Sequence, residues 1–287
     1  MDALLQALVN GLLSGSLIAV PAVGFTALFA ILRYPSFAVA GYVSVGAFAG
    51  WWVNTRFGLG AAPALVMAFI AGGLSGLACE MGALRRLMPS GALTVSIASI
   101  AVNLVLENIL RFVFGNDLRG FDLPILPDLQ WGGVFIGVQQ LWNLALAVAV
   151  VAAVFGFLMF TRFGRAMRAV ADNPDLARLK GIDPRRIAAI AVVLGAGLAG
   201  AGGVLLGLDT SIDPMTGYRV LLSVFAAAVL GGLGSVPGAV VGALVLGLAE
   251  ELALLAVPAT YRTAVGFAAI LLILTFRPRG LLGEKAV

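Results

Sequence analysis

The chain is a succession of apolar runs, most of them long enough to cross a lipid bilayer. A transmembrane helix needs about 20 mostly apolar residues. Charged residues make up only 11% of the chain, which excludes ordinary soluble domains. We therefore expect a single all-α transmembrane domain over residues 1–287, a polytopic helix bundle of about nine spans, with eight to ten as the range. The spans are expected at 4–32, 36–53, 62–84, 91–113, 140–160, 187–208, 218–233, 237–256 and 260–276.

Two of these spans are irregular. The first is long and contains Pro21, which predicts a kink or a break because proline lacks a backbone N–H. The seventh is short, ends in the sequence GGLGS and is a candidate re-entrant segment. The 37 glycines stand among alanines and serines inside the apolar runs, which is typical of membrane helices that pack through small residues.

One long polar stretch, residues 162–186, interrupts the apolar runs after the fifth span. It holds seven of the eighteen Lys and Arg residues, with three aspartates between them. Asn173-Pro174 is a helix start and Gly181 a helix end, so we expect a short capped helix over 174–180. So short a helix needs a surface to pack on. A plain loop is the alternative, but the second cap-and-proline pair, Asp183-Pro184, favours an ordered element that binds a partner.

Lys and Arg residues are distributed unevenly between the two sides of this topology. Thirteen of the eighteen, including the seven within 162–186, lie on the same side of the membrane as that stretch, and five lie on the other side. Because basic loops are expected in the cytoplasm, we expect 162–186 and the C-terminus to be cytoplasmic and the N-terminus to lie outside. The largest outside segment, 114–139, contains Asp117, Asp122 and Asp128. It is either a plain connector or an acidic surface for an extracytoplasmic partner.

Polar side chains inside the spans are candidates for a translocation path, because charge and hydrogen-bonding groups are costly in lipid. Four of them follow one another at steps of three or four in the fourth span, so they share one helix face. The second span and its start hold three more. Interhelical hydrogen bonding is the alternative for all of them, and the sequence does not decide between the two. The candidates are Ser36, Tyr42, Ser44, Ser96, Ser99, Asn103 and Glu107.

Other acidic residues are expected at the borders of the apolar region. Glu80 precedes two arginines near the inner surface, so local pairing and snorkelling account for it. Glu250 and the glutamate after it are expected to be solvated at the outer end of a span, and Asp209 and Asp213 beside an outer loop.

Several kinds of chemistry are excluded by residue types that the chain lacks. It has no histidine, so a Ser-His-Asp triad, a His-containing zinc site and a histidine proton relay are impossible. Cys79 is the one cysteine, so the chain has no disulfide framework and no cysteine-based metal site. No G-x-x-x-x-G-K-[ST] sequence is present, so the chain has no P-loop for ATP. We expect no enzyme, no cofactor and no metal in this chain. The net charge of +4 sits at span ends and in one loop and does not indicate nucleic-acid binding.

The polar stretch resembles the coupling loop of ABC importer membrane subunits, whose pattern is E-A-A, three residues and then G. Here Asp175-Leu176-Ala177 is followed after three residues by Gly181. Longer segments closely resemble the LivH-type permeases of branched-chain amino acid ABC transporters. They are residues 14–50, 163–183, 207–251 and 271–283, so the resemblance covers most of the chain.

The resemblance implies a multi-pass permease subunit of the bacterial inner membrane, with a periplasmic N-terminus and alternating access as its mechanism. Its partners would be a LivM-type permease, two ATPase subunits that bind ATP and Mg, and a periplasmic substrate-binding protein. Whether the second permease is a LivM-type chain or another copy of this one stays open. The implied docking helix would use Asp175, Ala177, Leu179 and Gly181, and the ATPase surface would be contacted by Arg165, Arg168 and Arg178.

One segment departs from the family pattern. Relatives often have Asn-Phe-Ala-His-Gly after the first span, where this chain has Ser36-Phe37-Ala38-Val39-Ala40 and Gly41. The cargo is therefore expected to be a branched-chain or other small amino acid, with urea, amides, aromatic acids or sugars as alternatives. An ion-coupled secondary transporter and a passive channel are the alternatives of another class.

Overall fold

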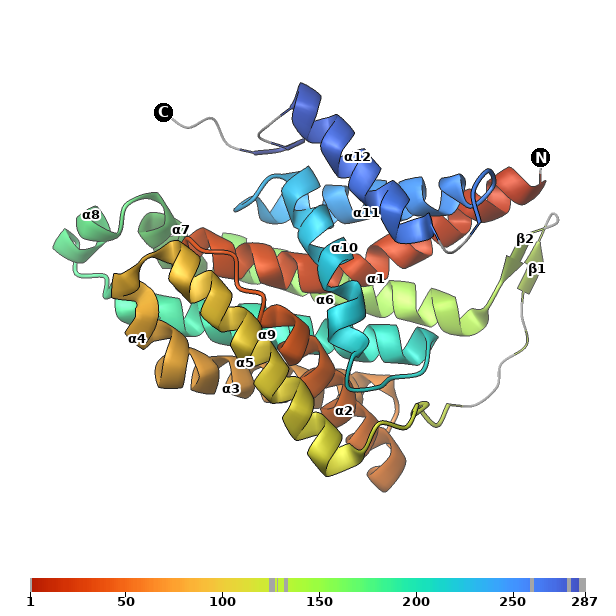
Figure 1. Cartoon of the computed structure of the whole chain (residues 1–287), viewed down its shortest axis with the longest axis horizontal. Helices are drawn as coiled ribbons and strands as arrows, with labels where there is room; N and C mark the ends of the chain where they lie inside the picture. Colours follow the sequence, from red (N-terminus) through yellow and green to blue (C-terminus); the bar gives the residue numbers. More distant parts are fainter. Residues whose placement is uncertain are drawn as a thin grey trace.

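The computed structural model is a bundle of helices with one small β-hairpin (Figure 1). The structure describes residues 2–123, 127, 129–131, 134–258, 261–277 and 280–283. Asp128 and two of the thirteen basic residues counted above, Arg279 and Lys285, lie outside these residues. The helices are α1 (Asp2–Leu32), α2 (Val39–Phe57), α3 (Ala61–Cys79), the π-helix η1 (Glu80–Leu84), α4 (Arg85–Leu87), the 3-10 helix η2 (Met88–Ser90), α5 (Ala92–Phe114), α6 (Val138–Phe160), α7 (Arg162–Asp172), α8 (Pro174–Leu179), α9 (Pro184–Asp209), α10 (Thr216–Gly231), α11 (Val236–Ala253) and α12 (Arg262–Phe276). The hairpin strands are β1 (Leu129–Trp131) and β2 (Val134–Ile136), paired antiparallel.

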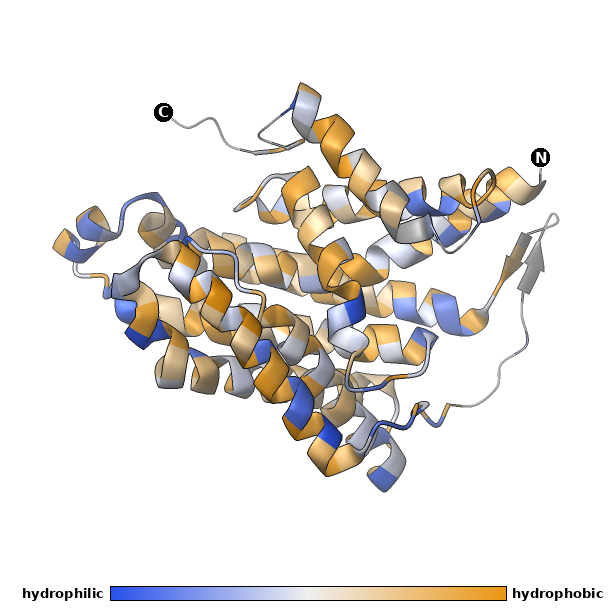
Figure 2. Ribbon diagram, in the orientation of Figure 1, coloured by the Kyte–Doolittle hydropathy of each residue, from blue (hydrophilic) through white to orange (hydrophobic). Residues whose placement is uncertain are grey.

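The all-α membrane bundle is confirmed, but the expected count of nine spans is not. Among the described residues, six helical stretches are long and apolar enough to cross a bilayer: Ala3–Leu32, Ala61–Ser90, Ala92–Phe114, Val138–Phe160, Pro184–Asp209 and Val236–Ala253. α10 has 16 residues and α12 has 15. At 1.5 Å per residue α10 is roughly 24 Å long, shorter than a hydrocarbon core of about 30 Å. Figure 2 shows that hydrophobic residues predominate along the long helices, with hydrophilic residues at several of their ends and on α8.

Of the kink or break expected at Pro21, the break is wrong, because α1 runs unbroken from Asp2 to Leu32, and the kink stays a prediction. The proline ring lies against α9 at Gly202, where a Cβ would approach the ring to 2.6 Å. Its neighbours Val20 and Ala22 are fully buried. A glycine on the facing helix therefore provides the space that the ring occupies inside the bundle.

The centre of the bundle is formed by α1 and α9. α1 packs along α9 and α11, and α9 packs along α2 and α3. Small residues allow this close packing: a Cβ added to Gly24 of α1 would lie 2.5 Å from the carbonyl oxygen of Gly195 in α9. The main core cluster accordingly draws on α1, α2, α3, α9, α10 and α11, with one residue each from α6 and α12.

Polar connections gather at two opposite ends of the bundle. At one end, the backbones of Arg119 and Ile212 exchange two hydrogen bonds of 2.8 Å, and the Asn54 side chain bonds the backbone of Asp122. The described residues 114–123 and the α9–α10 connection therefore share that end. α6 leads from it to α7 and α8, and its 23 residues span roughly 35 Å. Residues 162–186 thus lie at the opposite end (Figure 1).

Candidate functional site

The short helix α8 forms where the capping pattern predicted it, over Pro174–Leu179. The Asn173 side-chain oxygen accepts hydrogen bonds from the backbone N–H groups of Asp175 and Leu176, at 3.1 and 3.0 Å. Pro174 takes the first helical position, where its missing N–H costs nothing. Asp183 repeats the arrangement at the start of α9 by accepting from the N–H of Arg185 at 2.9 Å.

The end of α8 is a Schellman motif built on Gly181. The Ile182 N–H donates to the carbonyl of Ala177, and the Gly181 N–H to that of Arg178, both at 3.0 Å. Gly181 has a φ of 80°, the left-handed conformation that glycine adopts without steric strain. Both ends of α8 are thus determined by residues that the sequence pattern identified.

α8 is held on the bundle by Ala177. This side chain is 4% exposed and packs in a cluster with Met167 and Val170 of α7 and Ile187 and Ala191 of α9. The surface that the short helix needed is therefore supplied by its own chain. Ala177 faces inward, so among the residues expected to build the docking helix it serves as the anchor.

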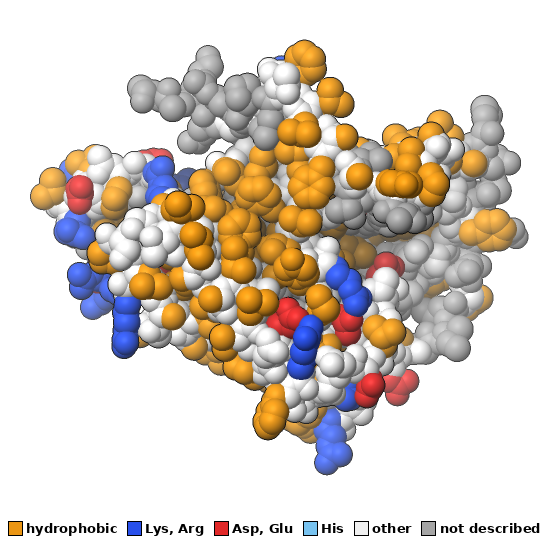
Figure 3. All heavy atoms as spheres, viewed as in Figure 1, with side chains coloured by type: hydrophobic (Ala, Val, Ile, Leu, Met, Phe, Trp, Pro, Cys, Tyr) orange, Lys and Arg blue, Asp and Glu red, His pale blue; other side chains and the backbone are white. Residues whose placement is uncertain are grey.

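The outward side of α8 is apolar at two positions. Leu179 is 83% exposed and Leu176 is 56% exposed. Asp175 and Arg178 are also exposed on the same helix. Figure 3 shows Lys and Arg side chains gathered at the end of the molecule where α8 lies. This end offers two exposed leucines within a basic surface.

The arginines of α7 do not all face solvent freely. Arg165 is exposed. Arg168 is also exposed, but its guanidinium donates a hydrogen bond to the carbonyl of Leu158 in the last turns of α6. Gly164 packs on the backbone of that same residue, where a Cβ would come within 2.1 Å of the carbonyl oxygen. Arg168 therefore also fixes the corner between α6 and α7.

The candidates of the fourth span share one buried face of α5, as the spacing predicted. Ser96, Ser99, Asn103 and Glu107 are all buried. The Ser99 hydroxyl donates to the carbonyl of Ser96 at 2.6 Å and accepts from the N–H of Phe37 at 2.8 Å. Glu107 forms an ion pair with Arg111 one turn on. The polar side chains of Ser99 and Glu107 therefore have partners within this chain.

The three candidates at the second span are buried too, but they do not gather at one place. Ser36 lies at the α1–α2 connection, and Tyr42 packs beside Gly76 of α3. The Ser44 hydroxyl donates to the carbonyl of Pro214 and accepts from the N–H of Gly217, both at 3.0 Å. Contact of any of the seven candidates with cargo stays a prediction.

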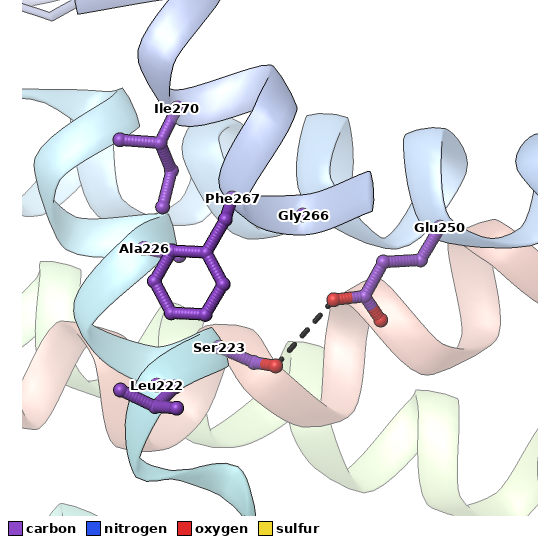
Figure 4. Close-up of a pocket in the computed structure, with 7 residues that line it drawn as sticks. All are labelled: Leu222, Ser223, Ala226, Glu250, Gly266, Phe267 and Ile270. Carbon is purple, nitrogen blue, oxygen red and sulfur yellow. Dashed lines mark hydrogen bonds between the residues drawn. The ribbon is translucent and has the colours of Figure 1, made fainter. Parts of the chain in front are cut away.

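Two acidic residues expected in water are buried instead. Asp213 is 8% exposed, forms an ion pair with Arg219 and accepts from the Thr216 hydroxyl at 3.2 Å. Glu250 is 4% exposed. Its carboxylate accepts from the Ser223 hydroxyl at 3.4 Å across a small hollow between α10, α11 and α12, as Figure 4 shows. The residue pattern of α11 alone did not predict the burial of Glu250 against Ser223, because Ser223 belongs to another helix.

A polar cavity of ≈ 170 Å³ lies between α1, α6, α9 and α11. Its lining combines carboxylate, amide and hydroxyl groups with two leucines: Asn10, Leu13, Ser14, Leu17, Gln140, Asp209 and Glu251. Sequence reasoning missed Asn10, Ser14 and Gln140, because their meeting depends on the packing of separate helices. No group of three or more metal-ligating side chains occurs among the described residues.

Comparison with known proteins gives consistent matches over nearly the whole chain. Residues 7–276 match the family described as Branched-chain amino acid transport system / permease component. The high-affinity branched-chain amino acid transport system permease protein BraD of Pseudomonas aeruginosa is 32% identical over 299 residues, covering 99% of this chain and 97% of the relative.

Two further relatives carry similar descriptions. The permease protein LivH of Escherichia coli K12 is 33% identical over 305 residues, covering 99% of this chain and 96% of the relative. The probable permease protein LivH of Methanocaldococcus jannaschii is 29% identical over 252 residues, or 85% of this chain and 79% of the relative. No solved structure matches the chain.

Proposed function

The chain belongs to the family of branched-chain amino acid transport permeases, and on this premise we propose that it lines the path of an ABC importer for leucine, isoleucine, valine or other small amino acids. Its relatives are permease components of such systems, which favours this function over the sugar, urea and ion-coupled alternatives. The cargo is proposed from the descriptions of these relatives.

The single observation that carries the mechanism is the form of α8. Ala177 anchors the helix to α7 and α9, while Leu176 and Leu179 are exposed. Exposed leucines on a rigidly capped helix favour a protein partner, because covering them removes apolar surface from water. The partner in this proposal is an ATPase subunit, which displaces α8 when its nucleotide state changes.

The remaining partners are proposed on the ground of the same family membership. A LivM-type permease completes the path, two ATPase subunits bind ATP and Mg, and a periplasmic protein delivers the cargo. The end of the bundle that carries α8 is cytoplasmic in this proposal, which agrees with its share of Lys and Arg residues. The segment 114–139, whose residues Arg119 and Asp122 lie at the opposite end, would then face the periplasm and meet the binding protein.

Alternating access supplies the transport step. Movement of α8 passes to α7 and α9, because the three helices share the cluster around Ala177. α9 lies at the centre of the bundle against α1, α2 and α3. Its displacement would therefore reach most of the core. The polar cavity that contains Asn10 and Gln140 is a candidate for the outer part of the path, because its amide and carboxylate groups can hydrogen-bond a zwitterion.

Uptake of radiolabelled leucine tests the proposal. Cells that lack their own leucine uptake and express the complete importer are either depleted of ATP or treated with an uncoupler. We expect uptake to stop without ATP and to persist with the uncoupler. The opposite pattern would overturn the proposal in favour of an ion-coupled transporter. Competition by unlabelled isoleucine, valine, urea and arabinose then identifies the cargo class.

A further inference from the structure

The connection between α1 and α2 touches both the polar stretch 162–186, which is the proposed coupling loop, and the π-helix η1 that continues α3. It consists of residues 33–38, and its first two side chains point to different partners. Arg33 contacts the end of α7, and Tyr34 contacts the π-helix η1. No sequence pattern indicated a role for either residue.

Arg33 has a backbone conformation that is unusual for its type. Its φ is 60°, and it is the one non-glycine residue among those described with a positive φ. Glycine would adopt this conformation without strain, so the backbone alone does not account for an arginine here. The guanidinium supplies the reason: it donates a hydrogen bond to the carbonyl of Ala171.

The Arg33 bond ends close to α8. Ala171 lies in the last turn of α7, two residues before Asn173, the N-cap of α8. Carbonyl groups in the last turn of a helix have no partner within it and carry partial negative charge. A displacement of α8 that moves the end of α7 therefore pulls directly on the Arg33 side chain.

Tyr34 makes the second contact, and it is buried. The side chain is 2% exposed and its hydroxyl donates to the Glu80 carboxylate at 3.0 Å. Burial, together with the charge of Glu80, raises the pKa of Tyr34 above its ordinary value, so the hydroxyl remains a donor at neutral pH.

Glu80 is the first residue of the π-helix η1, Glu80–Leu84. A short π-helix inside a longer helix is a local widening that is frequent at functional sites. Tyr34 also packs with Leu84 of η1 and Val95 of α5 in one buried cluster. The ring therefore joins the inner ends of α3 and α5, and α5 carries the buried polar face described above.

We propose that Arg33 and Tyr34 form a relay that transmits movement of the coupling loop to α3 and α5. Arg33 moves with the end of α7, and Tyr34, the next residue, moves the π-helix η1 through Glu80. Both are positioning residues: they touch neither ATP nor cargo. The inference rests on the proposed function, because the ATPase subunits are the source of the movement.

The first test measures coupling in the reconstituted importer. Arg33→Gly removes the guanidinium, and glycine adopts the φ of 60° at this position without strain. Tyr34→Phe removes only the hydroxyl. We expect each to raise the ATP hydrolysed per leucine taken up by roughly fivefold or more, with normal amounts of assembled complex. Matched controls are Arg56→Gly, an exposed arginine of α2 at the opposite end, and Tyr218→Phe, an exposed tyrosine of α10. Both should keep the wild-type ratio.

The second test does not depend on transport. Gly181→Val disturbs the end of α8, and hydrogen exchange at Glu80–Leu84 is measured on the purified full-length chain in detergent. Exchange should rise in the Arg33 background and stay unchanged in the Arg33→Gly background. A wild-type coupling ratio in both relay variants, or a proportional loss of uptake, hydrolysis and assembly, overturns the relay. The relay is also overturned if Gly181→Val changes hydrogen exchange at Glu80–Leu84 equally in the Arg33 and Arg33→Gly backgrounds. Absence of ATP-dependent uptake by the wild type would instead overturn the proposed function, and the exchange result would still decide the relay.

Discussion

Gly46 of α2 and Gly200 of α9 are in backbone contact: a Cβ on Gly46 would lie 2.2 Å from the Cα of Gly200. The two helices approach this closely because neither residue has a side chain. α9 is the centre of the bundle and also receives α8 through Ile187 and Ala191. The packing of these glycines therefore sets the position of α9, the helix on which α8 packs.

Gly46→Ala should destabilise the protein. The added methyl group meets backbone that can yield only if the helices separate, and overpacking of this kind costs about 1–3 kcal/mol. We expect a lower midpoint of thermal unfolding in detergent. Gly156→Ala is the matched control, because nothing lies within 4 Å of a Cβ at that position in α6. Equal midpoints for the two variants would contradict the close approach.

Gly181→Val should uncouple ATP hydrolysis from uptake while the chain still reaches the membrane. No atom lies within 4 Å of a Cβ there, so the strain comes from the φ of 80° alone. A β-branched residue in that conformation costs about 1–3 kcal/mol, which loosens the end of α8. Gly181→Asn is the control, because asparagine tolerates this φ better. Wild-type uptake by the valine variant would exclude a docking role for the helix.

Leu179→Asp should weaken binding of the ATPase subunits. Burying a leucine is worth about 1.5–3 kcal/mol, so we expect roughly 10- to 100-fold weaker association. Co-purification of ATPase with detergent-solubilised chain measures it. Leu118→Asp replaces a leucine that is 65% exposed at the opposite end of the bundle, and it should bind as the wild type does. An equal loss of ATPase co-purification in both variants would indicate a general defect of the chain instead of a lost contact at α8.

Ser99→Ala tests whether the buried face of α5 holds helices together or contacts cargo. The substitution leaves the N–H of Phe37 without its acceptor, which costs about 1–3 kcal/mol when the group is buried. Ser96→Ala loses a bond only to Ala92 in its own helix and should cost less. We expect lower thermal stability for Ser99→Ala, with the KM for leucine within about twofold of wild type, since the serine is fully used inside the chain. A large rise in KM at normal stability would instead assign Ser99 to the path.

The local elements were the most predictable part of the molecule. α8 begins and ends where Asn173, Pro174 and Gly181 predicted, because caps and prolines act within a few residues. The shared face of Ser96, Ser99 and Asn103 was predictable for the same reason, since the helical period places them in line. The count of nine spans was not confirmed, because apolar length does not distinguish a short packed helix from one that crosses the bilayer.

The sequence by itself determined the class of the protein, a small-residue-rich helical membrane bundle, and the short capped helix within its polar stretch 162–186. Only the tertiary structure decided what long-range packing brings together: Gly202 beside Pro21, Ser223 on Glu250, and Arg33 on Ala171. The physical reason is the range of the interactions. Hydropathy and capping depend on neighbours along the chain, whereas the environment of a buried carboxylate or a strained arginine depends on helices that are distant in sequence.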